Sequence, residues 1–175
     1  MLVEKTVIAM LGVAFLIAGS IYAQQPTAPN PRDVVPEKMP FDVPYGTPIS
    51  LERAQAAINT AVAEAKKQDW KMNVAVVDSG GNLVAFQRMD GAQLASIQVA
   101  EHKARTAAMF RRETKVFEDG IINNSNYLLT LDGIIASRGG IPLVEQGKII
   151  GAIGCSGGTG SQDEVVCKAG AAVIK

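Results

Sequence analysis

The sequence of 175 residues contains a single histidine and only two cysteines. Zinc sites are built mainly from histidine and cysteine ligands at characteristic spacings. One histidine and two cysteines do not supply such a pattern, so a zinc site of the usual kind is excluded. Serine and cysteine nucleophiles generally need a nearby base, and no second histidine is present to serve one. The sequence therefore favours a binding protein over an enzyme.

Aromatic residues are also scarce, and neither sign of charge dominates. Aromatics make up 5% of the chain, and 17 basic residues balance 17 acidic ones. Few aromatic rings leave no platform on which nucleic-acid bases could stack. A balanced charge gives no electrostatic attraction toward nucleic acid or an anionic membrane surface. We therefore expect neither of these as a partner of the mature protein.

The N-terminus, MLVEKTVIAMLGVAFLIAGSIYAQQP, differs in character from the rest of the chain. Its apolar run, from Val7 to about Gly19, is shorter than the ~20 residues that a membrane-spanning helix needs. A short charged start, an apolar run and a final alanine are typical of a secretory signal peptide. We predict a signal peptide at residues 1–23, cleaved after Ala23, with an uncleaved anchor as the main alternative. Cleavage would place the mature protein in the periplasm or outside the cell.

Residues 24–49 form a proline-rich arm that holds seven of the eight prolines. Proline at this density prevents helix formation and disfavours a central strand. The second half of the arm carries four large apolar residues. We expect it to lie on the folded domain or on a neighbouring subunit. These residues are Met39, Phe41, Val43 and Tyr45.

The remaining residues, 50–175, have the periodicity of a mixed α/β domain. Both predicted strand pairs are hairpins, so the sheet should be antiparallel with helices packed on it. The polar stretch 118–133 should hold one short helix at most. The predicted elements are a helix over 51–68 capped by Ser50, strands 72–78 and 83–89, a helix over 95–111, strands 141–145 and 148–156 around Gln146-Gly147, and a helix over 162–173 with a capping box from Ser161 to Glu164.

The helix over 95–111 carries the only histidine and has two unlike sides. Alanines dominate the side that should lie against the sheet. His102, Thr106 and Met109 gather on nearly the opposite side, at i, i+4 and i+7. A surface that mixes an imidazole, a hydroxyl and a thioether needs a cover, which could be a flat ligand or another subunit.

Imidazole and thioether groups are both known axial ligands of haem iron, and basic side chains can pair with the haem propionates. Lys103, at the edge of this side, and Arg105 are candidates for that pairing. A subunit contact explains the same spacing without any ligand, so both interpretations stay open on periodicity alone.

The two cysteines and the glycine-rich loop between them need separate interpretation. Cys155 and Cys167 are either two buried thiols or a disulfide, because sequence spacing does not define the geometry that a disulfide requires. The loop precedes a helix, where anions can bind. However, Asp163 and Glu164 fall in the first turn and would repel phosphate, so we interpret the loop as a structural turn.

Two longer stretches resemble the GlcG/HbpS family, also called the haem-degrading or DUF336 domain and similar to the C-terminal domain of PduO proteins. They are VAVVDSGGNLVAFQRMDGAQLASIQVAEHKARTAAMF and GGIPLVEQGKIIGAIGCSGGTGSQDEVVCKAGAAV. The resemblance covers roughly residues 50–174, and the motifs occur in family order.

The resemblance implies a profilin-like, three-layer α/β/α domain, which agrees with the element order predicted above. It also implies homo-oligomers, commonly octamers, and binding of a small molecule, with haem as the ligand described for several members. Storage, delivery or redox sensing of haem, or its slow degradation, would follow. In a haem-binding branch the threonine of the K-A-x-T motif, here Thr106, is a candidate axial ligand. The alternative function is a module without haem, or an accessory subunit of a periplasmic oxidoreductase or organic-acid utilisation system.

Overall fold

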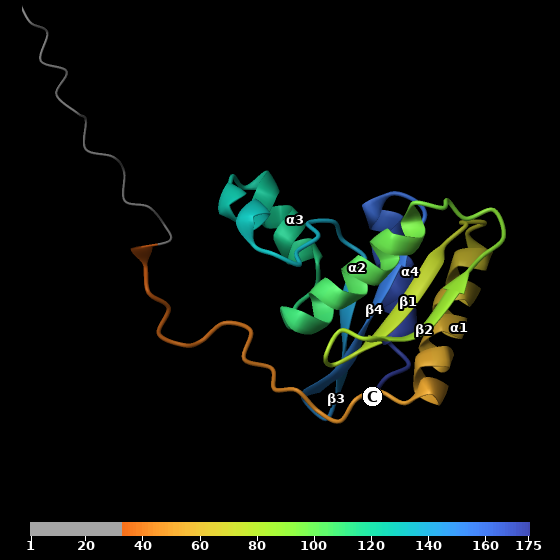
Figure 1. Ribbon diagram of the computed structural model, residues 1–175, viewed down its shortest axis with the longest axis horizontal. Helices are drawn as coiled ribbons and strands as arrows, with labels where there is room; N and C mark the ends of the chain where they lie inside the picture. Colours follow the sequence, from red (N-terminus) through yellow and green to blue (C-terminus); the bar gives the residue numbers. More distant parts are fainter. Residues whose placement is uncertain (1–32) are drawn as a thin grey trace, which may run out of the picture. The chain divides into compact units, whose positions relative to one another are not determined.

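Four antiparallel strands form the sheet, in the order β2-β1-β4-β3. The computed structural model describes residues 33–175, so the predicted signal peptide lies outside the described residues. Residues Lys38–Lys175 form one compact unit (Figure 1). Its elements are α1 (Leu51–Lys67), β1 (Asn73–Asp78), β2 (Leu83–Arg88), α2 (Ser96–Met109), α3 (Lys115–Ile122), the 3-10 helix η2 (Asn126–Thr130), β3 (Gly140–Glu145), β4 (Lys148–Ser156) and α4 (Gly160–Ala171).

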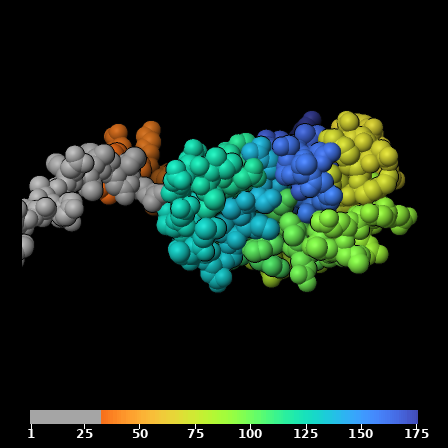
Figure 2. Space-filling view, turned by 90° about the horizontal axis from the view of Figure 1, so that it is seen from above, coloured from red at the N-terminus to blue at the C-terminus, as the bar shows by residue number. Residues whose placement is uncertain are grey.

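Helices cover both faces of this sheet. Helices α1 and α4 pack together on one face, over β1 and β4, and α2 crosses the other face (Figure 1). The space-filling view places the yellow residues of α1 and the green residues around α2 on opposite sides of the unit (Figure 2). Each face has its own core: a larger one under α1 and α4, and a smaller, alanine-rich one under α2. The predicted three-layer α/β/α fold with an antiparallel sheet is confirmed.

Small residues allow α2 to approach the sheet closely. Ala100, Ala104, Ala107 and Ala108 are all fully buried against the strands. Opposite them on β4, a Cβ added at Gly154 would collide with the carbonyl oxygen of Ala100. Only glycine fits there, so α2 is held tightly and its outward side chains have fixed positions.

The predicted helix ends and turns agree with the structure at most positions. Ser50 caps α1 by accepting a hydrogen bond from the backbone N–H of Arg53, at 3.4 Å. Gln146 and Gly147 both have positive φ, at 48° and 74°, as a tight type I′ hairpin turn requires. The predicted capping box of α4 is wrong by two residues, because Thr159 and Gln162 form it instead of Ser161 and Glu164.

The polar stretch after α2 contains more helix than predicted. Helix α3 begins at Lys115, before the stretch starts, and η2 follows within it. Phe117 anchors α3, because its ring is 1% exposed and lies 5.4 Å from the ring of Phe110. Phe117 thus helps to hold a segment whose polar sequence predicted one short helix at most.

The second half of the proline-rich arm lies on the domain. The N–H of Gly46 donates to the carbonyl oxygen of Ile149 at 2.8 Å, and the N–H of Ile149 donates to that of Pro44 at the same distance. The Tyr45 hydroxyl donates to the carbonyl oxygen of Met109 at 2.9 Å. The arm therefore joins the start of β4 to the C-terminal end of α2.

Cys155 and Cys167 form a disulfide that joins β4 to α4, so the interpretation as two free thiols is wrong. Their Cα atoms lie 5.6 Å apart, and both side chains are fully buried. The sequence could not show this pairing, because it depends on where α4 packs on the sheet.

We expect the double substitution Cys155→Ala/Cys167→Ala to lower the free energy of unfolding by about 3 kcal/mol, because the cross-link closes a short loop in the unfolded chain. Urea denaturation followed by circular dichroism measures the change. A loss below about 1 kcal/mol would show that the bond adds little to the packing around it.

Candidate functional site

Four residues form what we call the outer face of α2: His102, Arg105, Thr106 and Met109. The imidazole of His102 is half-buried, and Arg105 is exposed. Met109 is 53% exposed, so its thioether is open to a partner. Seven residues separate His102 from Met109, which places them two turns and about 10 Å apart along the helix.

The hairpin turn between β1 and β2 borders this face on one side. Arg105 donates from its Nε to the carbonyl oxygen of Gly81 at 3.3 Å. Gly81 has a φ of 81°, and a Cβ there would lie 3.3 Å from the sulfur of Met109. The turn therefore touches both Arg105 and Met109 and fixes their positions.

Asp78 holds this turn in shape. Its Oδ1 accepts hydrogen bonds from the N–H groups of Gly80 and Asn82, at 2.8 and 2.9 Å. Partial burial raises the pKa of Asp78, but the hydrogen bonds from Asn82 and the turn backbone outweigh it and leave the pKa below its ordinary value. Asp78 thus acts as a turn residue that stabilises the hairpin turn beside the site.

The segment after η2 borders the other side and covers Thr106 completely. The Thr106 hydroxyl donates to the carbonyl oxygen of Gly133 at 2.9 Å and accepts from the N–H of Ile135 at 3.2 Å. Part of the cover that this face was predicted to need is therefore supplied by the chain itself. In this conformation the hydroxyl is fully engaged, and His102 and Met109 remain at the surface.

Lys103 lies elsewhere than predicted. Its side chain is 1% exposed, and its ammonium group lies 2.7 Å from a carboxylate oxygen of Asp163 on α4. It also donates to the carbonyl oxygen of Cys155 at 3.3 Å. The prediction that Lys103 stands at the edge of the outer face is wrong. Its side chain points inward because it pairs with Asp163, which lies 60 residues later in the sequence.

Asp163 also fills the place where an anion would bind at the start of α4. Its Oδ1 accepts from the N–H groups of Gly157 and Gly158, at 3.0 and 3.1 Å. Burial raises the pKa of Asp163 above its ordinary value, and Lys103 with the two glycine N–H groups offsets part of this rise. The loop is therefore a structural turn whose own carboxylate occupies its N–H groups.

The donors on the outer face fit a haem group that would be held from one side. His102, Thr106 and Met109 project from one side of a single helix, and the imidazole of His102 would supply a nitrogen to the iron. The imidazole is accessible, Met109 can contact the ring edge, and the guanidinium of Arg105 can pair with a propionate. Among residues 33–175, no three histidine, cysteine, aspartate or glutamate side chains gather in a cluster that could hold a metal ion.

Sequence reasoning missed both borders of this face. The contacts of Gly81 and the latch from Gly133 and Ile135 to Thr106 arise from segments 24 to 29 residues distant along the chain. The positive-φ glycine in the SGGN turn was the available signal for the first. Nothing in the sequence indicated the second.

Within the described part of the chain, no helix is long and apolar enough to cross a bilayer.

The topology and the outer face of α2 together define a class of protein. It is a three-layer α/β/α protein in which the helix on one face of the sheet presents an imidazole and a thioether outward. The family model described as "Haem degrading protein HbpS-like" matches residues 49–172. The chain belongs to this HbpS-like family.

Individual relatives agree with that assignment. Protein GlcG of Escherichia coli strain K12 is 43% identical over 108 residues, which are 62% of this chain and 81% of the relative. A double mutant of Streptomyces reticuli HbpS has a solved structure with a TM-score of 0.69 and 30% identity, covering 87% of this chain and 99% of the other. A crystal structure of a PduOC–heme complex has a TM-score of 0.67 and 26% identity, covering 74% and 96%. The description of the family model names haem, and one of these neighbours was crystallised with heme.

Proposed function

We propose that this protein is an exported, oligomeric haem-binding protein whose site is the outer face of α2. Haem would be stored, delivered or sensed, or slowly degraded. Support comes from the family, from the neighbour that was crystallised with heme, and from the donors on this face. The predicted octamer is part of this proposal, because a second copy could supply the other side of the ring.

The half-buried imidazole of His102 carries the proposal. It lies between the β1–β2 hairpin turn and the segment after η2, with Met109 two turns away and Arg105 beside the hairpin turn. Bound haem would supply an iron centre for redox chemistry or gas binding. We propose His102 as the protein ligand to that iron, with Met109 against the ring edge. Thr106 becomes a ligand only where the segment around Gly133 and Ile135 releases its hydroxyl.

The disulfide supports export. Cys155 and Cys167 are bonded to each other, and such bonds persist mainly outside the reducing cytoplasm. A periplasmic or secreted location, with cleavage after Ala23, is therefore part of the proposal. Mass spectrometry of the N-terminus after expression with its natural leader tests it, and a chain that retains residues 1–23 would contradict it.

A haem titration of the purified protein, read from the Soret band, tests the proposed function directly. We expect a saturable Soret shift with one haem per outer face or per pair of faces. Glu101→Ala, which changes the neighbouring side chain on another side of the helix, serves as a matched control and should bind like the unsubstituted protein. Haem that stays spectrally free in the presence of excess protein would contradict the proposal.

Haem affinity should also depend on pH. Protons compete with iron for the nitrogen of an imidazole, so a lower pH disfavours ligation by histidine. We expect the affinity to fall as the pH is lowered from 7.5 to 5, and the fall to be absent in His102→Ala. Equal pH profiles of the two proteins would assign the ligand to another group.

A further inference from the structure

Strand β2 forms one edge of the sheet and is the less protected of the two edges. On the other edge, strand β3 contains Pro142, which has no N–H to donate. The first residue of β3 is bonded to Thr114. The N–H of Gly140 donates to the Thr114 hydroxyl at 2.9 Å, and the N–H of Thr114 donates to the carbonyl oxygen of Gly140 at 3.0 Å. In β2, three consecutive apolar residues are half-exposed, and Leu83 before them is 48% exposed. An apolar edge strand of this kind pairs readily with another strand.

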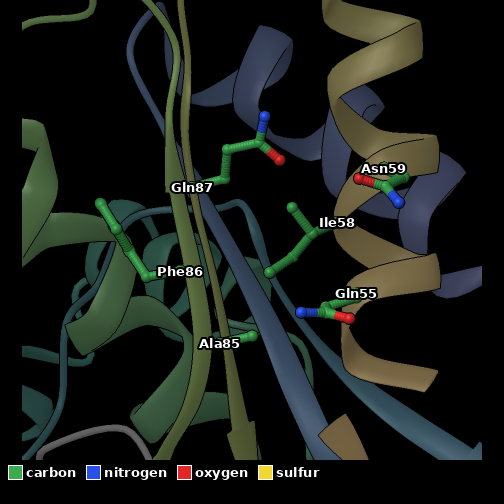
Figure 3. A pocket seen from close by; sticks show the side chains of 6 residues that line it. All are labelled: Gln55, Ile58, Asn59, Ala85, Phe86 and Gln87. Atoms are coloured by element: carbon green, nitrogen blue, oxygen red, sulfur yellow. The ribbon is translucent and has the colours of Figure 1, made fainter. Parts of the chain in front are cut away.

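Helix α1 covers this edge only in part. Two open grooves of about 370 and 440 Å³ run between α1 and β2 and meet at Gln87. Figure 3 shows Ile58 of α1 and Gln87 of β2 pointing into the first groove, while Phe86 points to the opposite side of the strand. On that opposite side Phe86 packs in part against the alanine-rich core under α2, so the groove side of the β2 edge is the more open of its two faces.

We propose that the β2 edge pairs antiparallel with the β2 edge of a second copy of this chain, forming a continuous eight-stranded sheet. The inference deepens the proposed oligomer by naming one of its interfaces, and it rests on that oligomer. Opposite residues in an antiparallel pair point to the same face of the sheet. When a strand pairs with its own copy, one residue must therefore lie directly opposite the same residue of the copy, and the two-fold axis passes between these two residues.

Phe86 is the residue that suits this axis best. Its ring would lie opposite the ring of its copy, which is a favourable cross-strand pair. Ala85 would lie opposite Gln87 of the partner subunit. Arg88 would then lie beyond the regular pairing, near the apolar Val84 of the partner subunit, so no like charges meet. A register shift in the β1–β2 pairing leaves Val84 as an extra residue, and the regular part of β2 begins at Ala85.

Helix α1 has a charge pattern that matches the same axis. Its stripe toward the β2 edge carries exposed Glu52 near the start, exposed Asn59 in the middle and exposed Lys66 near the end. Asn59 lines the first groove together with Phe86 and Gln87, and Lys66 lines the second groove together with Arg88. Glu52 and Lys66 each lie seven residues from Asn59, on opposite sides of it. A two-fold axis near Asn59 would therefore bring Glu52 toward Lys66 of the partner subunit, and the symmetry would form this pair two times.

The spacing of the layers allows this contact. Helix α1 packs over both β1 and β2, so its axis lies slightly inside the edge. With strands about 4.8 Å apart, two such helices would lie about 10 Å from each other across the axis, the usual distance for packed helices. Charge, register and helix spacing thus point to one occupant, a second copy.

Charge reversal tests the interface without disturbing the core. Sedimentation of the purified full domain should show that Glu52→Lys and Lys66→Glu each raise the dissociation constant of this contact about tenfold, because each places two like-charged pairs across the axis. An equimolar mixture of the two variants, or the double variant, restores opposite charges and should recover the original mass. Unchanged masses for both single variants, or no recovery in the mixture, would overturn the proposal.

A second variant acts at the strand itself. Phe86→Asp places two carboxylates on the axis and should lower the oligomer mass at least twofold, whereas the matched control Val144→Asp, on β3, should leave it unchanged. Circular dichroism confirms folding of each variant, and the charge-reversal pair decides the matter if Phe86→Asp does not fold. Haem titrations on the same samples separate the two proposals. A monomer that binds haem overturns this interface and the proposed oligomer but leaves haem binding standing, whereas a paired protein that does not bind haem overturns only the proposed haem-binding function.

Discussion

Replacing His102 with alanine is expected to weaken haem binding at least tenfold, a loss of about 1.4 kcal/mol in binding free energy. The imidazole is the only accessible nitrogen ligand on the outer face of α2, and it is half-buried between the two flanks that border this face. Loss of an axial nitrogen ligand also changes the visible spectrum, because the ligand sets the electronic state of the iron. Titration of haem into the variant, followed at the Soret band, measures both effects.

The matched comparison is Thr106→Ala. Its hydroxyl bonds Gly133 and Ile135, so this variant should lose the latch on the covering segment and bind haem as tightly as the unsubstituted protein, or more tightly. If Thr106→Ala abolishes binding while His102→Ala has no effect, the ligand is the threonine and the covering segment must move aside in the bound state.

Replacing Lys103 with methionine is expected to lower the free energy of unfolding by about 3–5 kcal/mol, because it leaves the buried carboxylate of Asp163 without a counter-charge. Both side chains are nearly inaccessible, at 1% and 3% exposure. In the double variant Lys103→Met/Asp163→Asn the amide oxygen can still accept from Gly157 and Gly158 and carries no charge. This double variant should therefore be more stable than Lys103→Met alone. Urea unfolding at pH 7 compares the three proteins.

The same pair predicts the sign of a pH effect. Burial raises the pKa of Asp163, and removal of Lys103 removes the main opposing influence. A carboxyl with a raised pKa takes up its proton at a higher pH in the folded than in the unfolded state, so stability rises as the pH falls through its folded pKa toward its unfolded pKa. The stability of Lys103→Met should therefore recover relative to the original protein as the pH is lowered from 7 toward the ordinary pKa of aspartate. A deficit that is constant over this range would show that the loss comes from packing rather than charge.

Much of the fold could be predicted because it rests on local patterns. The helical stripe from Ala54 to Ala65, the β-branched strand before the SGGN turn and the Gln146-Gly147 turn each depend on neighbouring residues only. The alanine side of α2 was also predicted, since it follows from a 3.6-residue period. The cap of α4 was misplaced because two overlapping Ser/Thr-x-x-Glu/Gln patterns exist, and only packing selects Thr159.

The rest of the candidate site depends on segments that the sequence does not place together. The period groups His102 with Met109, but it could not show that Lys103 turns inward to Asp163, 60 residues later. It also could not show that the backbone near Gly133 closes over Thr106. The disulfide belongs to the same class, because it requires β4 and α4 to meet at Cys155 and Cys167. Each of these features is a long-range contact whose energy appears only in the folded chain.

The visible absorption spectrum of protein purified from haem-supplemented cells tests the central claim most directly. We expect a coloured protein with a Soret band in the unsubstituted chain, and loss or a clear shift of that band in His102→Ala but not in Glu101→Ala. A colourless, folded and fully assembled protein from the same cells would contradict the assignment of haem to the outer face of α2.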